Sequence, residues 1–152
     1  MRKLALYEPP YGQHAHAFSE QKRRVDQIVQ TGKPGDAATF FFSEIGIPPQ
    51  ELEEMKRSPN WEGISKIDFT LAYDYAVLGN GTVPDSAKLV RVPTLVMTGE
   101  KSMDFMRPTA DRIAALIPGA KRQTLDGQTH QAAPEVVAPL LIEFFSGPNA
   151  PG

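Results

Sequence analysis

The spacing of apolar residues changes twice along this chain. A short apolar run, Leu4 to Tyr7, is stopped by Pro9-Pro10, which predicts a buried strand close to the first residue. From Phe18 to Leu89 the apolar residues recur mainly at helical spacing, and glycine, proline and asparagine interrupt them. After Pro93 a compact run, Thr94 to Met97, again has the character of a buried strand. The chain is therefore expected to leave a sheet, form a long helical insert and return to the sheet.

The last third of the chain predicts two helices and one more strand. An amphipathic helix spans Arg107 to Ile117, a weaker strand covers Arg122 to Leu125, and Pro134 opens a last helix. Strands that alternate with helices imply a parallel sheet with right-handed crossovers. We therefore expect an α/β fold that is rich in helix: a three-stranded parallel partial sheet with a helical cap insert.

The insert of about 80 residues is too long to be a simple crossover. A small helical subdomain over the strand ends is the better interpretation, because binding sites form there in parallel sheets. We assign residues 1–10 and 90–147 to the sheet core and residues 11–89 to the helical cap. Residues 148–152 are rich in glycine, proline and asparagine, and we expect them to be a disordered tail.

Composition narrows the function classes. The chain has 152 residues, 41% of them hydrophobic, and no run approaches the ~20 apolar residues of a membrane span. It has no cysteine, which excludes disulfides and thiol catalysis and makes the cytoplasm the expected location. The formal charge is −2 and the only basic run is Lys22-Arg23-Arg24, so we expect neither a nucleic acid nor a membrane partner. His14 and His16 lack nearby cysteine or aspartate ligands, and we predict no metal and no cofactor.

A candidate for proton transfer lies after the last predicted strand. Gly127-Gln128-Thr129-His130 would place a histidine on a loop at the carboxyl end of that strand, a common position for a general base. No serine, cysteine or aspartate lies in a Gly-x-nucleophile-x-Gly turn anywhere in the chain. The sequence therefore offers a base without an obvious nucleophile.

The ordered set of motifs resembles the C-terminal half of an α/β-hydrolase over almost the whole chain. The motifs that carry the resemblance are Tyr7 to Pro10, Pro93 to Glu100, Ile117 to Ala120 and Gly127 to His130. The resemblance implies that the three strands correspond to the sixth, seventh and eighth of that fold. It also implies that the insert is the helical cap and that His130 is the catalytic histidine.

The resemblance leaves two carboxylates as partners of this histidine. The family often has Gly-x-x-Asp after the seventh strand, but here Ser102 stands at the aspartate position and Asp104 lies two residues further on. Some members, such as haloalkane dehalogenases, place the acid at the end of the sixth strand, where this chain has Glu8. We favour Glu8 and keep Asp104 as the alternative.

The resemblance also indicates what kind of protein this is. In the family the nucleophile precedes the equivalent of Leu4, so we expect a C-terminal fragment that is inactive alone. The complete enzyme would act on a small apolar ester or a related carbon–heteroatom bond. The alternatives are a non-catalytic binding or regulatory module, and one subunit of a split hydrolase. The expected partners are a small-molecule substrate once the chain is complemented, and an N-terminal hydrolase half or a second copy at the Leu4 edge strand.

Aromatic residues gather in the insert. Phe41, Trp61 and Tyr73 are our candidates for lining an apolar substrate pocket. The competing interpretation is that they form the small core of the insert itself.

Overall fold

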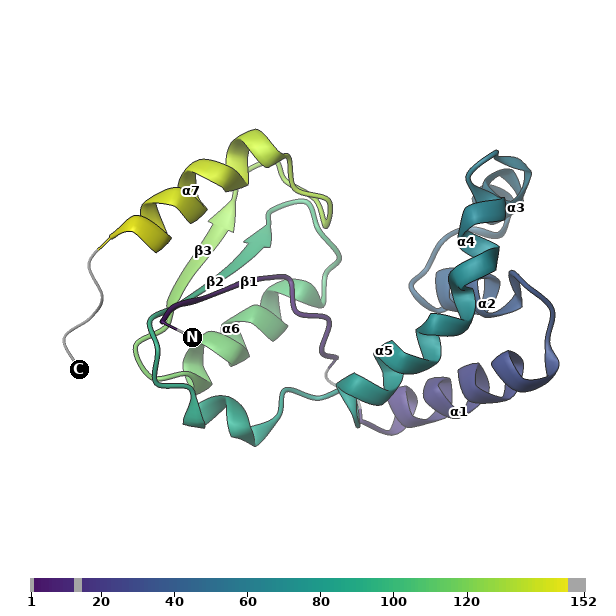
Figure 1. Ribbon diagram of the computed structural model, residues 1–152, viewed down its shortest axis with the longest axis horizontal. Helices are drawn as coiled ribbons and strands as arrows, with labels where there is room; N and C mark the ends of the chain where they lie inside the picture. Colours follow the sequence, from purple (N-terminus) through teal and green to yellow (C-terminus); the bar gives the residue numbers. More distant parts are fainter. Residues whose placement is uncertain (1, 13–14, 148–152) are drawn as a thin grey trace. The chain divides into compact units, whose positions relative to one another are not determined.

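The computed structural model describes residues 2–12 and 15–147, which form two compact units. One unit contains the strands and comprises residues 1–13 and 82–152, and the other is the helical insert, residues 14–81 (Figure 1). The sequence analysis assigned residues 82–89 to the insert, whereas their contacts group them with the sheet. The reason is that Val83 is buried in the core of the sheet unit. The predicted tail, residues 148–152, lies outside the described residues.

The sheet confirms the predicted fold class. Its strands β1 (Leu4–Tyr7), β2 (Thr94–Gly99) and β3 (Lys121–Leu125) are parallel and lie in the order β1-β2-β3. Leu4 pairs with Thr94, and Gly99 pairs with Leu125. Every residue of β2 is buried, because this central strand has a neighbour on both sides. The three carboxyl ends therefore lie along one edge of the sheet.

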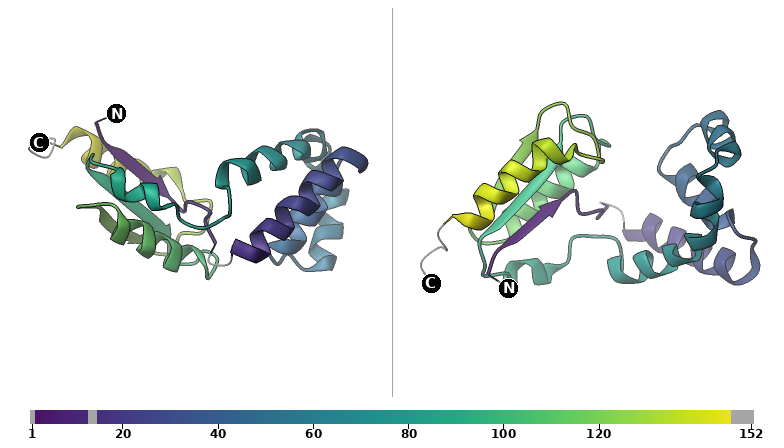
Figure 2. Two further views of the ribbon diagram at one scale, coloured as in Figure 1. Left: turned by 90° about the horizontal axis from the view of Figure 1, so that it is seen from below. Right: turned by 45° about the horizontal axis from the view of Figure 1, so that its top comes forward.

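Helices cover the two faces of this sheet. Helix α6 (Met106–Leu116) connects β2 to β3, and helix α7 (Pro134–Ser146) lies on the opposite face (Figures 1 and 2). The core lies between β2 and α6, where Val96 packs with Ala110 and Ile113. The short helix η2 (Asp85–Leu89) precedes β2 and also packs on α6.

The opposite side of the sheet is less completely covered. Strand β1 pairs with β2 alone among the described strands, and each of its four residues is partly exposed. Helix α7 has no fully buried residue, and Ile142 and Phe145 are 66% and 50% exposed. The Lys3 ammonium connects the start of β1 to the end of α7. It donates hydrogen bonds to the carbonyl oxygens of Phe144 at 2.7 Å and Gly147 at 2.6 Å. Self-association through β1 stays a prediction.

The helical unit has a small core of its own, which includes the buried residues Val25, Leu52 and Tyr75. Asp68 is also buried, and its Oδ2 accepts hydrogen bonds from the amides of Gly35, Ala37 and Ala38 at 2.9, 3.0 and 3.3 Å. No helix in the described part of the chain is long and apolar enough to cross a membrane. The elements of this unit are α1 (Ala15–Thr31), α2 (Asp36–Glu44), α3 (Pro49–Arg57), α4 (Trp61–Ile67), η1 (Asp68–Thr70) and α5 (Leu71–Leu78).

Candidate active site

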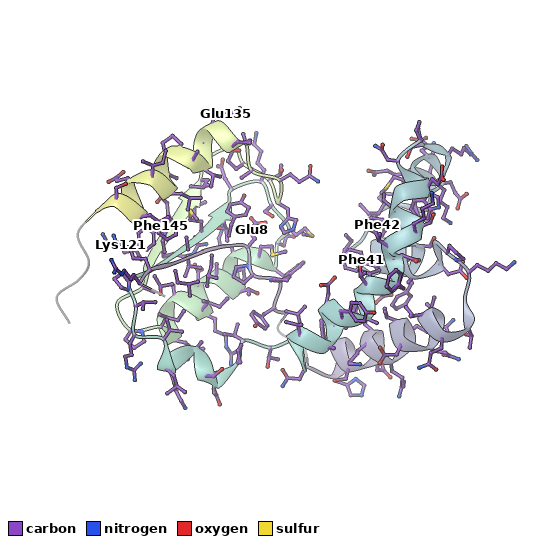
Figure 3. All side chains as sticks on the ribbon, viewed as in Figure 1. Glu8, Phe41, Phe42, Lys121, Glu135 and Phe145 are labelled. Atoms are coloured by element: carbon purple, nitrogen blue, oxygen red, sulfur yellow. The ribbon has the colours of Figure 1, made fainter. Side chains whose placement is uncertain are left out.

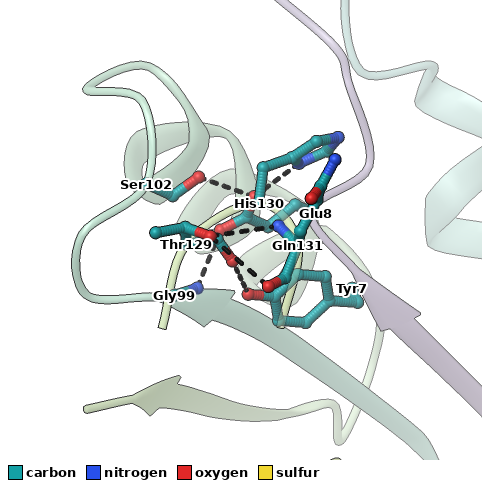
Figure 4. A network of polar contacts seen from close by, with 7 residues as sticks. All are labelled: Tyr7, Glu8, Gly99, Ser102, Thr129, His130 and Gln131. Carbon is teal, nitrogen blue, oxygen red and sulfur yellow. Dashed lines mark hydrogen bonds and ion pairs between the residues drawn. The ribbon is translucent and has the colours of Figure 1, made fainter. Parts of the chain in front are cut away.

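A polar network lies at the carboxyl ends of the three strands. Glu8 directly follows β1, Ser102 lies on the loop after β2, and His130 lies on the loop after β3 (Figure 4). Parallel pairing brings these residues together although they are far apart in the sequence, since every strand ends at the same edge. This edge is where ligands bind in open parallel sheets.

Glu8 has an unusual backbone conformation. Its φ is +45°, the only positive φ of a non-glycine among the described residues. A side chain in this region costs conformational energy on the order of 1–3 kcal/mol, and such strain is concentrated at functional sites. The Glu8 amide continues the ladder by donating to the Met97 carbonyl oxygen at 3.0 Å. The chain turns immediately after this bond, and the Glu8 carboxylate is directed over the end of β2.

The Glu8 carboxylate is fully buried and has three polar neighbours. Its Oε1 accepts a hydrogen bond from the Gly99 amide at 2.7 Å. Its Oε2 accepts one from the Ser102 hydroxyl at 2.7 Å and lies 2.7 Å from His130 Nδ1. Because an ionised carboxylate can only accept, the last contact assigns a proton to Nδ1. Hydrogen bonds of this kind offset the cost of removing a carboxylate from water.

The other nitrogen of His130 is open. The side chain of His130 is 53% exposed, and no hydrogen bond to its Nε2 is seen among residues 2–12 and 15–147. With a proton on Nδ1, the neutral ring presents the Nε2 lone pair outward. The arrangement is that of a histidine base whose tautomer is held by a buried acid.

The structure separates the two carboxylates that the sequence analysis named. Glu8 contacts His130, whereas Asp104 is exposed on the loop before α6 and makes no hydrogen bond or ion pair with His130 among the described residues. The geometry therefore favours Glu8 as the partner of the histidine. The catalytic roles of His130, Glu8 and Asp104 remain predictions.

Several residues that the sequence analysis missed hold the histidine loop in place. The Tyr7 hydroxyl donates to the Thr129 carbonyl oxygen, and the Lys101 amide donates to the Gln128 carbonyl oxygen at 2.8 Å. Gly99 lies so close to this loop that a Cβ there would be 2.3 Å from the Gln128 carbonyl oxygen. Their common signal was their position at strand ends, which becomes informative only once the strand order is known.

The Tyr7 phenol is a stable donor in this position. Burial raises its pKa above the ordinary value of 10.0, and the neighbouring negative charge of Glu8 raises the pKa further. Tyr7 therefore keeps its proton, and its bond to the histidine loop, over the whole neutral and mildly alkaline range.

The three predicted substrate-binding aromatics lie in the helical unit. Phe41 and Phe42 both come from α2, and the ring of Phe42 lies 5.6 Å from Phe41 and 6.4 Å from Trp61 (Figure 3). Tyr73 lies apart from these residues, packs edge-on against Phe69 at 6.1 Å and is 62% exposed. Phe41 and Trp61 are partly exposed, so none of the three side chains is fully buried in the core of the helical unit. Their role in substrate binding stays a prediction.

No group of three or more histidine, aspartate or glutamate side chains in the described part of the chain could hold a metal ion. His16 Nδ1 lies 4.0 Å from Glu20 Oε2, and His14 lies outside the described residues. The polar network at the strand ends is thus built from acids, hydroxyls, amides and one imidazole.

No protein-family model matches the chain, and no curated protein matches it. Solved structures do match. An α/β-hydrolase from Sphaerobacter thermophilus is 38% identical in sequence to this chain, with a TM-score of 0.80. The match covers 95% of this chain and 58% of the Sphaerobacter protein. The chain belongs to the α/β-hydrolase fold family.

Other α/β-hydrolase structures agree on the fold at lower identity. A hydrolase from Pseudomonas aeruginosa is 20% identical with a TM-score of 0.65, and the match covers 96% of this chain and 56% of that chain. An esterase from Exiguobacterium antarcticum is 16% identical with a TM-score of 0.60, and the match covers 95% and 57%. The present α/β-hydrolase chain thus spans slightly more than half the length of the structures it matches.

Proposed function

We propose that this chain carries the acid and base of a hydrolase that cleaves a small apolar ester or a related carbon–heteroatom bond. The observation that supports the proposal is the 2.7 Å contact between buried Glu8 and His130 Nδ1, with Nε2 left open. Likeness to hydrolase and esterase structures supports the reaction class.

In the proposed mechanism His130 Nε2 takes a proton from an attacking hydroxyl or water. The imidazolium that forms is stabilised by the Glu8 carboxylate at Nδ1, and Nε2 then returns the proton to the leaving group. Glu8 accepts hydrogen bonds throughout and does not take up the proton itself. No metal or cofactor is needed for these steps.

The nucleophile comes, in this proposal, from polypeptide outside these 152 residues, either in a longer form of the chain or in a separate hydrolase half. The Ser102 hydroxyl donates to Glu8 Oε2, the same oxygen that contacts Nδ1, and so lies on the Nδ1 side of the ring. It is therefore poorly placed to give its proton to Nε2. This geometry supports our expectation that the chain alone is nearly inactive.

The helical unit is proposed to act as the cap that selects the substrate. Its partly exposed aromatic side chains, Phe41, Trp61 and Tyr73, suit an apolar acyl or alcohol group. Substitution of these residues by alanine should raise KM for larger apolar esters more than for acetate esters, whereas kcat should change little.

Complementation tests the proposed function directly. The chain is co-expressed with the part of the Sphaerobacter thermophilus hydrolase that it does not match, and hydrolysis of short p-nitrophenyl esters is measured. We expect turnover in the mixture, loss of that turnover in His130→Ala, and almost none with either part alone. Binding of the two parts without turnover would favour a non-catalytic module. Turnover by the chain alone that is lost in His130→Ala would reveal a nucleophile within the 152 residues.

A further inference from the structure

Glu8 Oε2 has two donors, and only one of them is the histidine. The Ser102 hydroxyl donates to Oε2 at 2.7 Å, the same distance that separates this oxygen from His130 Nδ1 (Figure 4). We propose that Ser102 is a positioning residue that fixes the Glu8 carboxylate against His130. The importance of Ser102 for catalysis rests on the proposed function. The hydrogen bond between Ser102 and Glu8 is seen in the structure whatever that function is.

Two donors fix the orientation of the Glu8 carboxylate. The terminal torsion of a glutamate is soft, so a carboxylate with one hydrogen bond swings about its last bond. Gly99 holds Oε1 through its amide at 2.7 Å, and Ser102 holds Oε2. With one donor on each oxygen the carboxylate plane is fixed, and a remaining lone pair of Oε2 is left for Nδ1.

Ser102 also provides a donor to a buried carboxylate. The Glu8 side chain is fully buried, whereas His130 is half exposed and changes its protonation state during the proposed reaction. Whenever the ring is neutral, the buried negative charge depends on its hydrogen-bond donors alone. Ser102 supplies a donor that does not titrate, so this contact holds the carboxylate in its orientation in both states of the base.

Ser102 is close in the sequence to the other donor to Glu8, Gly99. Ser102 is partly buried and lies on the loop between β2 and α6, three residues beyond Gly99. The last residue of β2 and the loop after it thus each contribute one contact to the carboxylate, a backbone amide and a hydroxyl. The loop after β2 therefore supports an acid that follows β1, and among the described residues no acid of that loop contacts the histidine.

The experiment uses the chain alone, with ¹⁵N-labelled histidine and proton NMR of the imidazole N–H groups. Ser102→Ala removes the donor, Ser102→Cys replaces it with a weak one of similar size, and Ser102→Thr retains the hydroxyl. The control is Ser86→Ala, which removes an exposed hydroxyl elsewhere in the sheet unit. Far-ultraviolet circular dichroism identifies which variants are folded.

Wild type should show a downfield Nδ1–H resonance for His130 that disappears in Glu8→Gln. In Ser102→Ala, or in Ser102→Cys if the alanine variant does not fold, this resonance should move upfield. It should also exchange with water about fivefold faster, which corresponds to the net contribution of about one hydrogen bond. Ser102→Thr should restore the signal, and Ser86→Ala should leave it unchanged.

Two results would overturn the proposal. An unchanged resonance in a folded variant without the hydroxyl would mean that Ser102 does not position the pair. A downfield move would mean that Ser102 only competes with the histidine for Oε2. Neither result depends on ester turnover, so a failed complementation assay and a failed role for Ser102 can be told apart.

Discussion

Among the described residues, each of the two units buries one carboxylate, and the two carboxylates have different partners. Asp68 in the helical unit accepts three backbone amides, all near the start of α2. Glu8 in the sheet unit accepts one amide and one hydroxyl, and keeps its third contact for a half-exposed histidine. Burial and hydrogen bonding therefore do not by themselves distinguish a structural acid from a candidate catalytic acid. The histidine with an open nitrogen makes Glu8 the candidate for chemistry.

The units also differ in the range of their polar contacts. In the helical unit most ion pairs are local and largely exposed, such as Lys66 with Glu62 at 2.6 Å, and pairs of this kind add little stability. In the sheet unit the contacts of Glu8 span 91 to 122 positions of the sequence. A site assembled from such distant residues depends on the whole sheet, whereas a local pair depends on one helix.

The largest expected effect is on activity, from Glu8→Gln. The complemented hydrolase should lose about 10³–10⁴-fold in kcat, as expected when an acid that fixes the tautomer of a catalytic histidine becomes an amide. The measurement is ester turnover with Asp104→Asn as the matched control, which should keep most of its activity. Comparable losses in both variants would contradict the choice of Glu8.

Asp68→Ala should have the largest effect on stability. It leaves three buried amides without an acceptor, and we expect a loss of roughly 3 kcal/mol. The chain has a single tryptophan, Trp61, which lies in the helical unit, so its fluorescence during urea unfolding reports this unit. The exposed Asp74→Ala in α5 is the control. Equal midpoints for the two variants would show that Asp68 is not a structural acid.

Glycine substitutions should have opposite signs in the two units. Gly99→Ala places a Cβ 2.3 Å from the Gln128 carbonyl oxygen and should cost about 1–3 kcal/mol, because backbone must move to relieve the overlap. Gly63→Ala in α4 meets open space and should stabilise its helix by about 1 kcal/mol. Thermal unfolding followed by circular dichroism measures both. A neutral Gly99→Ala would mean that the histidine loop is not tightly seated on β2.

Tyr7→Phe should cost about 1 kcal/mol, the net value of its hydrogen bond to the Thr129 carbonyl oxygen. The pKa of Tyr7 is raised above 10.0 by burial and by Glu8. Its contribution is therefore fully present below pH 10 and is lost as the pH rises through the higher folded-state pKa. Stability curves of both proteins at pH 7 to 11 should converge at the alkaline end. Parallel curves would contradict a donor role for the phenol.

The smallest effect is expected for Glu53→Gln in the helical unit. A hydrogen bond from Lys56 lowers the pKa of Glu53 below 4.5, so its contribution is present above that pH and is lost as the pH falls through the lower value. The Glu53 side chain is exposed, so the unfolding midpoint at pH 7 should not change measurably. A clear decrease in the unfolding midpoint would mean that local ion pairs contribute measurably to the stability of the helical unit.

The sequence predicted the order of the elements well, because apolar periodicity is a local property. The strand after Pro93 and the histidine loop were both found in this way. Asp68 was missed, since nothing near it in the sequence indicates that the start of α2 would lie beside it. The end of the insert differs from the prediction for the same reason, because Val83 packs in a core formed by β2 and α6, which lie further along the chain.

By itself the sequence determined that three strands would lie parallel and that a histidine would follow the last of them, since alternation of short apolar runs with amphipathic helices leaves few other arrangements. It favoured Glu8 as the partner of His130 but kept Asp104 as an alternative, since each is a carboxylate that follows a strand. That choice needed the tertiary structure, in which β1 lies beside β2 and the positive φ of Glu8 turns its carboxylate toward His130. Strand order and backbone direction decide which residues meet across about a hundred positions of the sequence. The identities of the contacting residues do not specify either of them.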